Sequence, residues 1–292
     1  MRAEVVHKIP KLEVLRRTDS EQVDLLRHRD RPAWERLHDA AERHDASVRA
    51  VMEALARAGI PSTCVGRDAF RGPRADTDLV IAVGGDGTVL DVSHHLRTTP
   101  MLGVNSDPAT SVGYFCACSS QEFEVTLEHL VLGVISRMRL CRIAIQHNGT
   151  AFEYPCLNDI LLTSANPAMM SRYTLAAGSR SEQQASSGIW ISTPAGSTAG
   201  IRSAGGSVLP LEGDLIQYLV REPYVGKLVR YELLRGVRHL HEGLEVQSLM
   251  QNGQVFIDGP YITFPFRLGD TLTLREGVPL TILGMDPALR ER

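Results

Sequence analysis

Five consecutive apolar residues, 79–83 (LVIAV), run directly into the glycine-rich sequence 84–88 (GGDGT). An uninterrupted apolar run of this length is typical of a parallel strand that is buried on both faces. Beyond the glycines, apolar residues recur at helical spacing as far as Leu96, so we expect a helix that contains His94 and His95 two turns after its start. The pattern therefore predicts a strand, a glycine turn and a helix, which is the repeating unit of α/β folds.

The first half of the chain continues this alternation. Residues 32–59 have the apolar spacing of an amphipathic helix, with Pro32 in its first turn and a stop at Gly59 and Pro61. Further segments follow, namely a strand at 62–65, a loop at 66–78, a strand at 101–104 and a helix at 122–134. We therefore expect residues 1–137 to form an α/β domain with a doubly wound parallel sheet.

After Arg137 the pattern changes to short strand-like segments separated by Gly, Pro, Asn and Asp. The clearest are residues 142–146, 189–192, 215–220, 253–257 and 271–274. They predict a second, β-rich and sandwich-like domain at 138–292, whose last ~20 residues could pack back on the first domain. The polar stretch 178–188 is expected to be a mobile loop.

Composition excludes several classes of protein. The 292 residues carry 31 Lys+Arg against 34 Asp+Glu, so no broad basic field favours nucleic acid as a partner. No apolar run approaches the roughly 20 residues of a membrane span, and residues 1–30 lack a signal-peptide core. We therefore expect a cytoplasmic protein without a membrane or nucleic-acid partner.

The five cysteines show no metal-ligand spacing. They are Cys64, Cys116, Cys118, Cys141 and Cys156, and no Cys-x-x-Cys pair occurs among them. Buried free thiols are the preferred interpretation, ahead of a disulfide or a zinc site. We expect no fixed metal.

The glycine turn is the strongest chemical signal. Glycine permits backbone angles and close approaches forbidden to other residues, and amides at a helix N-terminus point their positive ends at an anion. Such a turn can hold a phosphate chain, and Asp86 could accept a proton from an attacking hydroxyl or bind magnesium. The alternative is a structural turn in which Asp86 only caps the helix. The spacing fits neither a Walker A loop nor a Rossmann fingerprint.

Three blocks resemble the NAD kinase family. The sequence 84–88 is shared by NAD kinases, diacylglycerol and sphingosine kinases and, more loosely, phosphofructokinases. The sequences 157–159 (LND) and 192–206 (STPAGSTAGIRSAGG) resemble the later motifs of NAD kinases. The similarity extends over roughly residues 79–269, through 104–105 (VN), 113–115 (GYF) and 257–259 (IDG). The sequences 103–108 (GVNSDP), 186–188 (SSG) and 220–223 (VREP) are most similar to the plant NADH kinase and mitochondrial NAD kinase branch.

The resemblance implies a kinase that transfers the γ-phosphoryl group of ATP to the adenosine ribose 2'-hydroxyl of NAD, NADH or both. Magnesium would accompany ATP, and the family suggests a homodimer assembled through the β domain. Asp86 would be the general base. The residues implied in binding are Gly85, Gly87 and Thr88 at phosphates, Asn158 and Asp159 at a ribose hydroxyl or adenine amine, and Thr198, Ala199 and Ser203 at the dinucleotide.

Each binding block also has a purely structural interpretation. An Asn-Asp pair after a strand is often a turn, and residues 192–206 could be a glycine-rich turn into a short helix. Arg172, Arg202 and Arg221 are candidate phosphate ligands by residue type alone. His94 and His95 are expected to be solvated or hydrogen-bonded helix residues and not catalytic groups.

Two departures from the family pattern concern the nicotinamide. Gly200 stands where most NAD kinases have Tyr, and Ser187 where most have Asp. We interpret them as a changed nicotinamide end that tolerates a reduced, uncharged ring. A lipid kinase of the same superfamily and a catalytically silent NAD(P)-binding sensor are the alternatives; the first usually carries Gly-Thr-Gly-Asn where this chain has 103–108.

Overall fold

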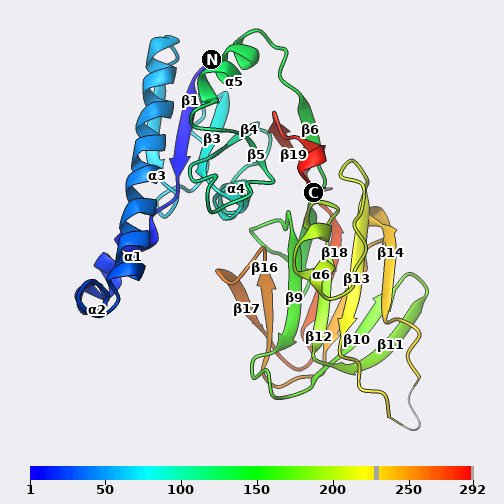
Figure 1. The fold of residues 1–292 in the computed structure, drawn as a ribbon. Helices are drawn as coiled ribbons and strands as arrows, with labels where there is room; N and C mark the ends of the chain where they lie inside the picture. Colours follow the sequence, from blue (N-terminus) through cyan, green and yellow to red (C-terminus); the bar gives the residue numbers. More distant parts are fainter. Residues whose placement is uncertain (227–229, 291–292) are drawn as a thin grey trace. The chain divides into compact units, whose positions relative to one another are not determined.

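The computed structural model describes residues 1–226 and 230–290. The chain divides into two compact units, Met1–Met138 with Thr281–Arg292, and Arg139–Leu280 (Figure 1). The C-terminal segment therefore returns to the first unit.

The first unit is built on a sheet with the order β2-β1-β3-β4-β19-β6, and β5 pairs with β4. The pairs β1–β2, β1–β3, β3–β4, β4–β5 and β4–β19 are parallel. The strands are β1 (Ala3–His7), β2 (Ser62–Gly66), β3 (Leu79–Gly84), β4 (Met101–Asn105), β5 (Cys116–Ser119), β6 (Arg137–Leu140) and β19 (Leu280–Leu283). Strand β3 is buried at every residue, as its apolar run predicts. Strand β1 is not predicted by the sequence pattern, and it lies inside the sheet because it pairs in parallel with both β2 and β3.

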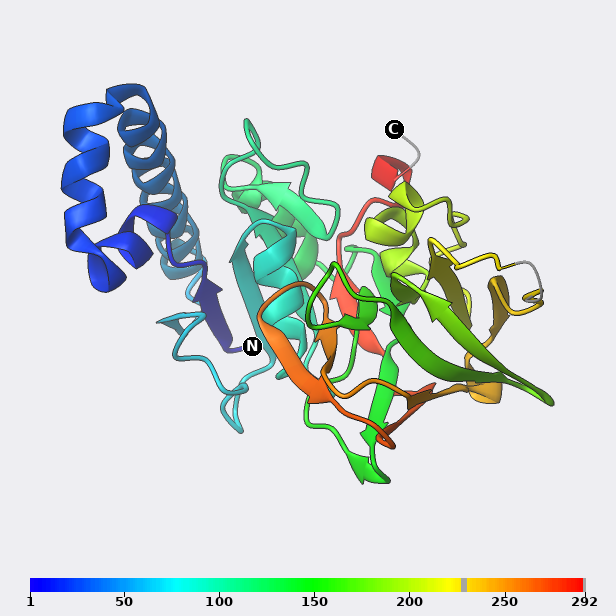
Figure 2. The ribbon, with the colours of Figure 1, turned by 90° about the horizontal axis from the view of Figure 1, so that it is seen from below.

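The helices of this unit are α1 (Lys11–Thr18), α2 (Ser20–Arg29), α3 (Arg31–Arg57), α4 (Asp86–Ser93) and α5 (Phe123–Val131). The predicted helix at 32–59 is confirmed as α3, whose N-cap Asp30 accepts a hydrogen bond from the N–H of Ala33 at 3.0 Å. Figure 2 shows α1 and α2 packed alongside α3. One placement was wrong: α4 ends at Ser93, so His94 is its C-cap and His95 lies outside the helix.

The second unit contains two six-stranded sheets, in the orders β11-β10-β15-β18-β7-β8 and β14-β13-β12-β9-β16-β17. The strands of the first are β7 (Ile143–His147), β8 (Thr150–Ala151), β10 (Ser171–Ala177), β11 (Arg180–Ser186), β15 (Leu244–Ser248) and β18 (Thr271–Glu276). Those of the second are β9 (Asp159–Ser164), β12 (Gly188–Ser192), β13 (Leu215–Arg221), β14 (Arg235–His239), β16 (Gly253–Ile257) and β17 (Ile262–Phe266).

Both sheets of this unit contribute to one apolar core. Leu175 and Val246 come from the first sheet and Ile160, Ile189 and Val255 from the second, and all five are fully buried. Shared burial between two sheets is the defining property of a β-sandwich. The predicted fold class, an α/β unit followed by a β-rich one, is therefore confirmed.

The expected mobile loop at 178–188 is wrong. Strand β11 pairs antiparallel with β10 along its whole length, from Ser171 opposite Ser186 to Ala177 opposite Arg180. Gly178, with φ +66°, makes the turn between them. The segment is an edge strand whose first half is largely exposed, so its polar composition reflects water on that side and not a lack of structure.

Among the residues that the structure describes, no helix is both long and apolar enough to cross a membrane.

Candidate active site

The glycine turn connects β3 to α4, and two of its three glycines, Gly84 and Gly85, serve close packing. Gly84, Gly85 and Gly87 all have ordinary φ values, so the expected need for unusual backbone angles is not observed. A Cβ at Gly84 would lie 2.2 Å from Oγ1 of Thr88, and one at Gly85 would lie 2.8 Å from Oγ of Ser111. Among the described residues, apart from its chain neighbours and the backbone of its own helix, no atom lies within 4 Å of where a Cβ of Gly87 would be. The space beside Gly87 is therefore open to a ligand.

Asp86 does not cap helix α4. The N-cap is Gly85, and Oδ1 of Asp86 accepts a hydrogen bond from the backbone N–H of Phe115 at 2.9 Å. The side chain is half-buried, and its Oδ2 accepts no hydrogen bond from any part of the chain that the structure describes. The carboxylate is thus oriented through one oxygen while the other can accept a proton.

Thr88 supports the turn from inside. The residue is buried, its side chain fills the space beside Gly84, and its N–H donates to the carbonyl of Gly85 at 2.8 Å. Any approach of Thr88 to a phosphate is therefore limited by its burial.

Basic side chains lie at the same edge of the sheet, where β1 and β2 also end. The N–H of Lys8 donates to the carbonyl of Val83 at 3.0 Å, and that of Arg67 donates to the carbonyl of His7 at 2.9 Å. Arg67 forms an ion pair with Asp91 at 3.3 Å. Ligands of open α/β sheets bind in the crevice at the carboxyl ends of the strands.

Lys8 is the cation at this edge that the sequence analysis missed. It is half-buried, and within the described chain no carboxylate lies at ion-pair distance from it. Burial lowers the pKa of Lys8, the charge of Asp107 raises it, and the charges of Arg67 and Arg43 lower it. Arg43 is itself paired with Asp107 at 3.0 Å. Lys8 is therefore able to interact with an anion from outside the chain.

A buried histidine holds the segment that follows β4. Nδ1 of His44 lies 3.0 Å from Oγ of Ser106, and the N–H of Ser106 donates to the carbonyl of Gly84 at 2.8 Å. Burial lowers the pKa of His44 to about 4, so the ring is neutral at physiological pH. His44 thus supports the glycine turn through packing and hydrogen bonding.

In the second unit, Asn158 and Asp159 lie at the start of β9 and are held by Asp258. Oδ1 of Asp258 accepts hydrogen bonds from the N–H groups of Asn158 at 2.6 Å and Asp159 at 3.0 Å, and Oδ2 accepts one from Leu157 at 2.8 Å. The thiol of Cys156 lies 3.1 Å from the same Oδ1. Three successive amides converging on one carboxylate make a rigid segment and not a simple surface turn.

Asp159 is only 7% exposed. Burial and the nearby charge of Asp258 raise its pKa to about 7, while a backbone hydrogen bond from Gly200 lowers it. Its carboxyl group can therefore donate as well as accept a hydrogen bond near neutral pH.

The predicted block at 192–206 packs directly on Asn158. The N–H of Thr193 donates to the carbonyl of Asn158 at 3.1 Å. A Cβ at Gly196 would lie 1.9 Å from that same oxygen, so only glycine fits. Two short helices follow, η1 (Ala195–Thr198) and α6 (Gly200–Ser203). Thr198 and Ala199 are half-buried at their junction, whereas Ser203 is exposed.

The two departures, Gly200 and Ser187, lie in different places. A Cβ at Gly200 would lie 3.1 Å from Cζ2 and Cη2 of the Trp190 ring. Ser187 precedes β12 at the end remote from Asp159, where its N–H donates to the carbonyl of Arg221 at 2.9 Å. Within one chain, the length of β12 therefore separates Ser187 from Asp159.

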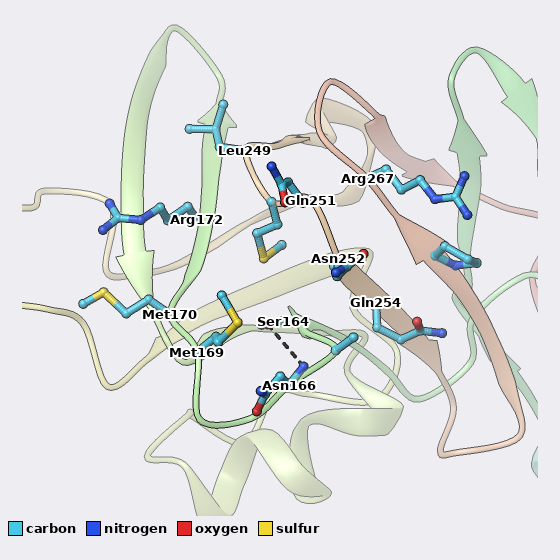
Figure 3. Close-up of a pocket in the computed structure, with 14 residues that line it drawn as sticks. Ser164, Asn166, Met169, Met170, Arg172, Leu249, Gln251, Asn252, Gln254 and Arg267 are labelled. Carbon is cyan, nitrogen blue, oxygen red and sulfur yellow. Dashed lines mark hydrogen bonds between the residues drawn. The ribbon is translucent and has the colours of Figure 1, made fainter.

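The three candidate arginines do not converge on Asn158. Arg202 is exposed on α6, and Cζ of Arg221 lies 6.0 Å from the centre of the Trp190 ring. Arg172 lines a cavity of about 640 Å³ at the opposite end of β9 from Asp159. Figure 3 shows the guanidinium groups of Arg172 and Arg267 on opposite sides of this cavity, pointing away from each other. They do not form a joint anion site.

One group of possible metal ligands occurs among the described residues, His38, Asp39 and Glu42 on the exposed side of α3. It does not include Asp86.

Comparison with known proteins identifies the family. The model for the ATP-NAD kinase N-terminal domain matches residues 65–135. A probable NADH kinase of Oryza sativa subsp. japonica is 34% identical over 266 residues, covering 84% of this chain and 82% of the rice protein. The NADH kinase of Arabidopsis thaliana is 30% identical over 267 residues, covering 84% of each chain.

Solved structures show the same fold. An NAD kinase from Archaeoglobus fulgidus in complex with ATP gives a TM-score of 0.69 at 23% identity, covering 100% of this chain and 96% of the archaeal one. Yeast NADH kinase complexed with NADH gives 0.67 at 16% identity, covering 99% and 85%. Neither alternative, a lipid kinase or a silent sensor, is supported by these comparisons. The extent of the similarity to the plant proteins shows that this chain is an enzyme of the NAD kinase family, in the branch that includes the plant NADH kinases.

Proposed function

We propose that this chain transfers the γ-phosphoryl group of ATP to the adenosine ribose 2'-hydroxyl of NAD, NADH or both, forming NADP(H). The observation that carries the proposal is the orientation of Asp86. One carboxylate oxygen is fixed by Phe115 and the other accepts no hydrogen bond from the described chain. The next residue, Gly87, has open space at its Cβ position. A general base must have such an available oxygen within reach of the proton it removes.

In this mechanism Asp86 removes the proton of the 2'-hydroxyl as that oxygen attacks the γ-phosphorus of ATP. The bond from the γ-phosphorus to the β,γ-bridging oxygen breaks, and ADP leaves with the bonding electrons. The N-terminus of α4, approached closely at Gly85 and Gly87, and the ammonium group of Lys8 stabilise the negative charge of the phosphates. Mg²⁺ bound to the ATP substrate would supply further positive charge to the phosphates.

The dinucleotide is assigned to the second unit. Asn158 offers an amide to a ribose hydroxyl or an adenine amine, and Asp159 offers a carboxyl that can donate or accept. Thr198 and Ala199 are small enough to let a ring approach their backbone. Ser203 is exposed on α6, so we assign it to the solvent-facing side of the bound dinucleotide.

The cellular setting belongs to the same proposal. All five cysteines are free thiols, which is common in a reducing compartment such as the cytoplasm. The family resemblance favours a homodimer assembled through the β-rich unit.

The test combines the purified chain with Mg²⁺-ATP and either NAD or NADH, followed by a dehydrogenase specific for the phosphorylated product. We expect the parent to form product with at least one dinucleotide. Asp86→Asn should form only a small residual amount of product. Dinucleotide binding without turnover would identify a sensor, and phosphorylation of diacylglycerol alone would identify a lipid kinase. Either result would overturn the proposal.

A further inference from the structure

A row of large apolar side chains crosses the outer face of the sheet that carries Asp159. Leu161 on β9 is opposite Trp190 on β12 and Phe256 on β16. The next residues along these strands, including Ile160, Ile191 and Ile257, are buried in the sandwich core. Because side chains alternate between the faces of a strand, the three residues of the row point outward together. All three are only half-buried.

The row is the floor of a cavity of about 330 Å³. Asp159, Gly259 and Pro260 complete its lining. A cavity of this size is in the range of small-molecule sites, which are mostly apolar with a few placed polar groups. The polar group here is the carboxyl of Asp159, whose pKa is raised to about 7. The cavity therefore suits a flat ring that can exchange a hydrogen bond with a carboxyl group at its edge.

Trp190 has room for its ring because residue 200 is glycine. Its ring atoms lie 3.1 Å from where a Cβ of residue 200 would be, closer than ordinary contact. Any side chain at position 200 would require the indole to shift by a few tenths of an ångström. The departure from the family pattern at Gly200 is therefore matched by an aromatic ring that enters the same space from β12.

We propose that Trp190, with Leu161 and Phe256, forms the stacking platform for a heterocyclic ring of the dinucleotide. This inference rests on the proposed function. A dinucleotide fits better than a lipid chain or a protein partner because the cavity shares Asp159 with the segment held by Asp258, so ring and ribose contacts would adjoin. Nicotinamide and adenine have the required flat π-face, and the experiment below distinguishes them.

The first test measures binding of NAD, NADH, ADP-ribose and ATP by calorimetry to the parent and to Trp190→Ala. Base stacking on an aromatic side chain corresponds to a loss of about five- to a hundredfold in affinity on truncation. We expect that loss for the dinucleotides and at most about twofold for ATP, with Trp190→Phe keeping most of the affinity. An equal loss for ADP-ribose places adenine on the platform, and a loss confined to NAD and NADH places nicotinamide there.

Phe264→Ala is the matched control. Phe264 is another half-buried aromatic residue of the same sheet, on β17, and it packs against Phe152 away from the cavity. It should lower stability without changing dinucleotide affinity. A second readout uses the fact that the chain has only two tryptophans. In Trp34→Phe, where Trp190 is the sole emitter, NAD should quench the fluorescence by contact.

A double variant tests the steric match. Gly200→Tyr alone should weaken dinucleotide binding, and Gly200→Tyr combined with Trp190→Ala should bind more tightly than Gly200→Tyr alone. If the parent binds dinucleotide and Trp190→Ala binds it equally well, the platform is wrong while the proposed function stands. If Trp190→Ala changes the oligomeric state measured by sedimentation but not the dinucleotide affinity, the row is a surface for a second copy of the chain. If the parent binds no dinucleotide, the proposed function itself fails.

Discussion

Oδ1 of Asp258 lies 2.6 Å from the backbone nitrogen of Asn158, a residue 100 positions earlier in the chain. Asp258 has φ +50°, a left-handed conformation that is uncommon outside glycine. Its carboxylate also accepts the N–H groups of Leu157 and Asp159. The conformation of the loop after β16 is therefore what presents Asn158 and Asp159 at the start of β9.

Replacing Asp258 by Ala should affect stability and dinucleotide binding together. Hydrogen bonds to charged groups contribute about 1.5–3 kcal/mol each, and relief of repulsion on Asp159 offsets part of the loss. We expect the free energy of unfolding to fall on the order of 3 kcal/mol, measured by denaturant titration at neutral pH. The Michaelis constant for dinucleotide should rise more than that for ATP.

Asp270→Ala is the control for that experiment, because Asp270 also accepts backbone and side-chain hydrogen bonds but lies away from Asn158, holding Arg267 and Asn148. This variant should lower the free energy of unfolding without raising the Michaelis constant for dinucleotide more than that for ATP. An unchanged Michaelis constant in Asp258→Ala would show that Asp258 does not position the binding segment.

Local patterns were sufficient for the glycine turn, α3 and most strands of the sandwich. Strand β1 was not predicted because it contains only a short apolar stretch. Its position inside the sheet follows only from its pairing with β2 and β3. Strand β11 was not predicted because its residues are polar. Lys8 and Trp190 are important because strand pairing places them next to residues that are distant in the sequence. No local pattern carries that information.

Asp86→Asn should separate catalysis from binding. Asparagine can keep the hydrogen bond from Phe115 but cannot act as a base at neutral pH. We expect turnover to fall on the order of 10² to 10⁴ with dinucleotide affinity little changed. Glu128→Gln, an exposed carboxylate on α5 of the same unit, is the control. Turnover of Asp86→Asn within about threefold of the parent would exclude the role of general base.

Lys8→Met should act on ATP. Loss of a hydrogen bond from an ammonium group to a phosphate costs about 1.5–3 kcal/mol, so the Michaelis constant for ATP should rise about ten- to a hundredfold. The constant for dinucleotide should change little, and Lys8→Arg should recover part of the affinity. Lys11→Met, at the exposed start of α1, provides the control in the same steady-state assay. A selective effect of Lys8→Met on the dinucleotide would place Lys8 at the acceptor instead.

The pKa of Asp159, about 7 in the folded protein against an ordinary value of 3.8, makes stability depend on pH. Between these two values the folded state binds a proton that the unfolded state has released. The free energy of unfolding therefore falls as pH rises through this window, by up to about 1.4 kcal/mol per pH unit, and changes no further from this residue above pH 7. In Asp159→Asn the titrating group is gone.

The difference in stability between Asp159→Asn and the parent isolates this residue from all other carboxylates. We expect the free energy of unfolding of the variant, relative to the parent, to increase from pH 4.5 to about pH 7 and then to level off. Denaturant unfolding at intervals of about one pH unit measures it. A difference that stays constant across this range, or that grows as pH falls, would show that Asp159 is ionised in the folded protein throughout, with burial and Asp258 too weak to hold the proton.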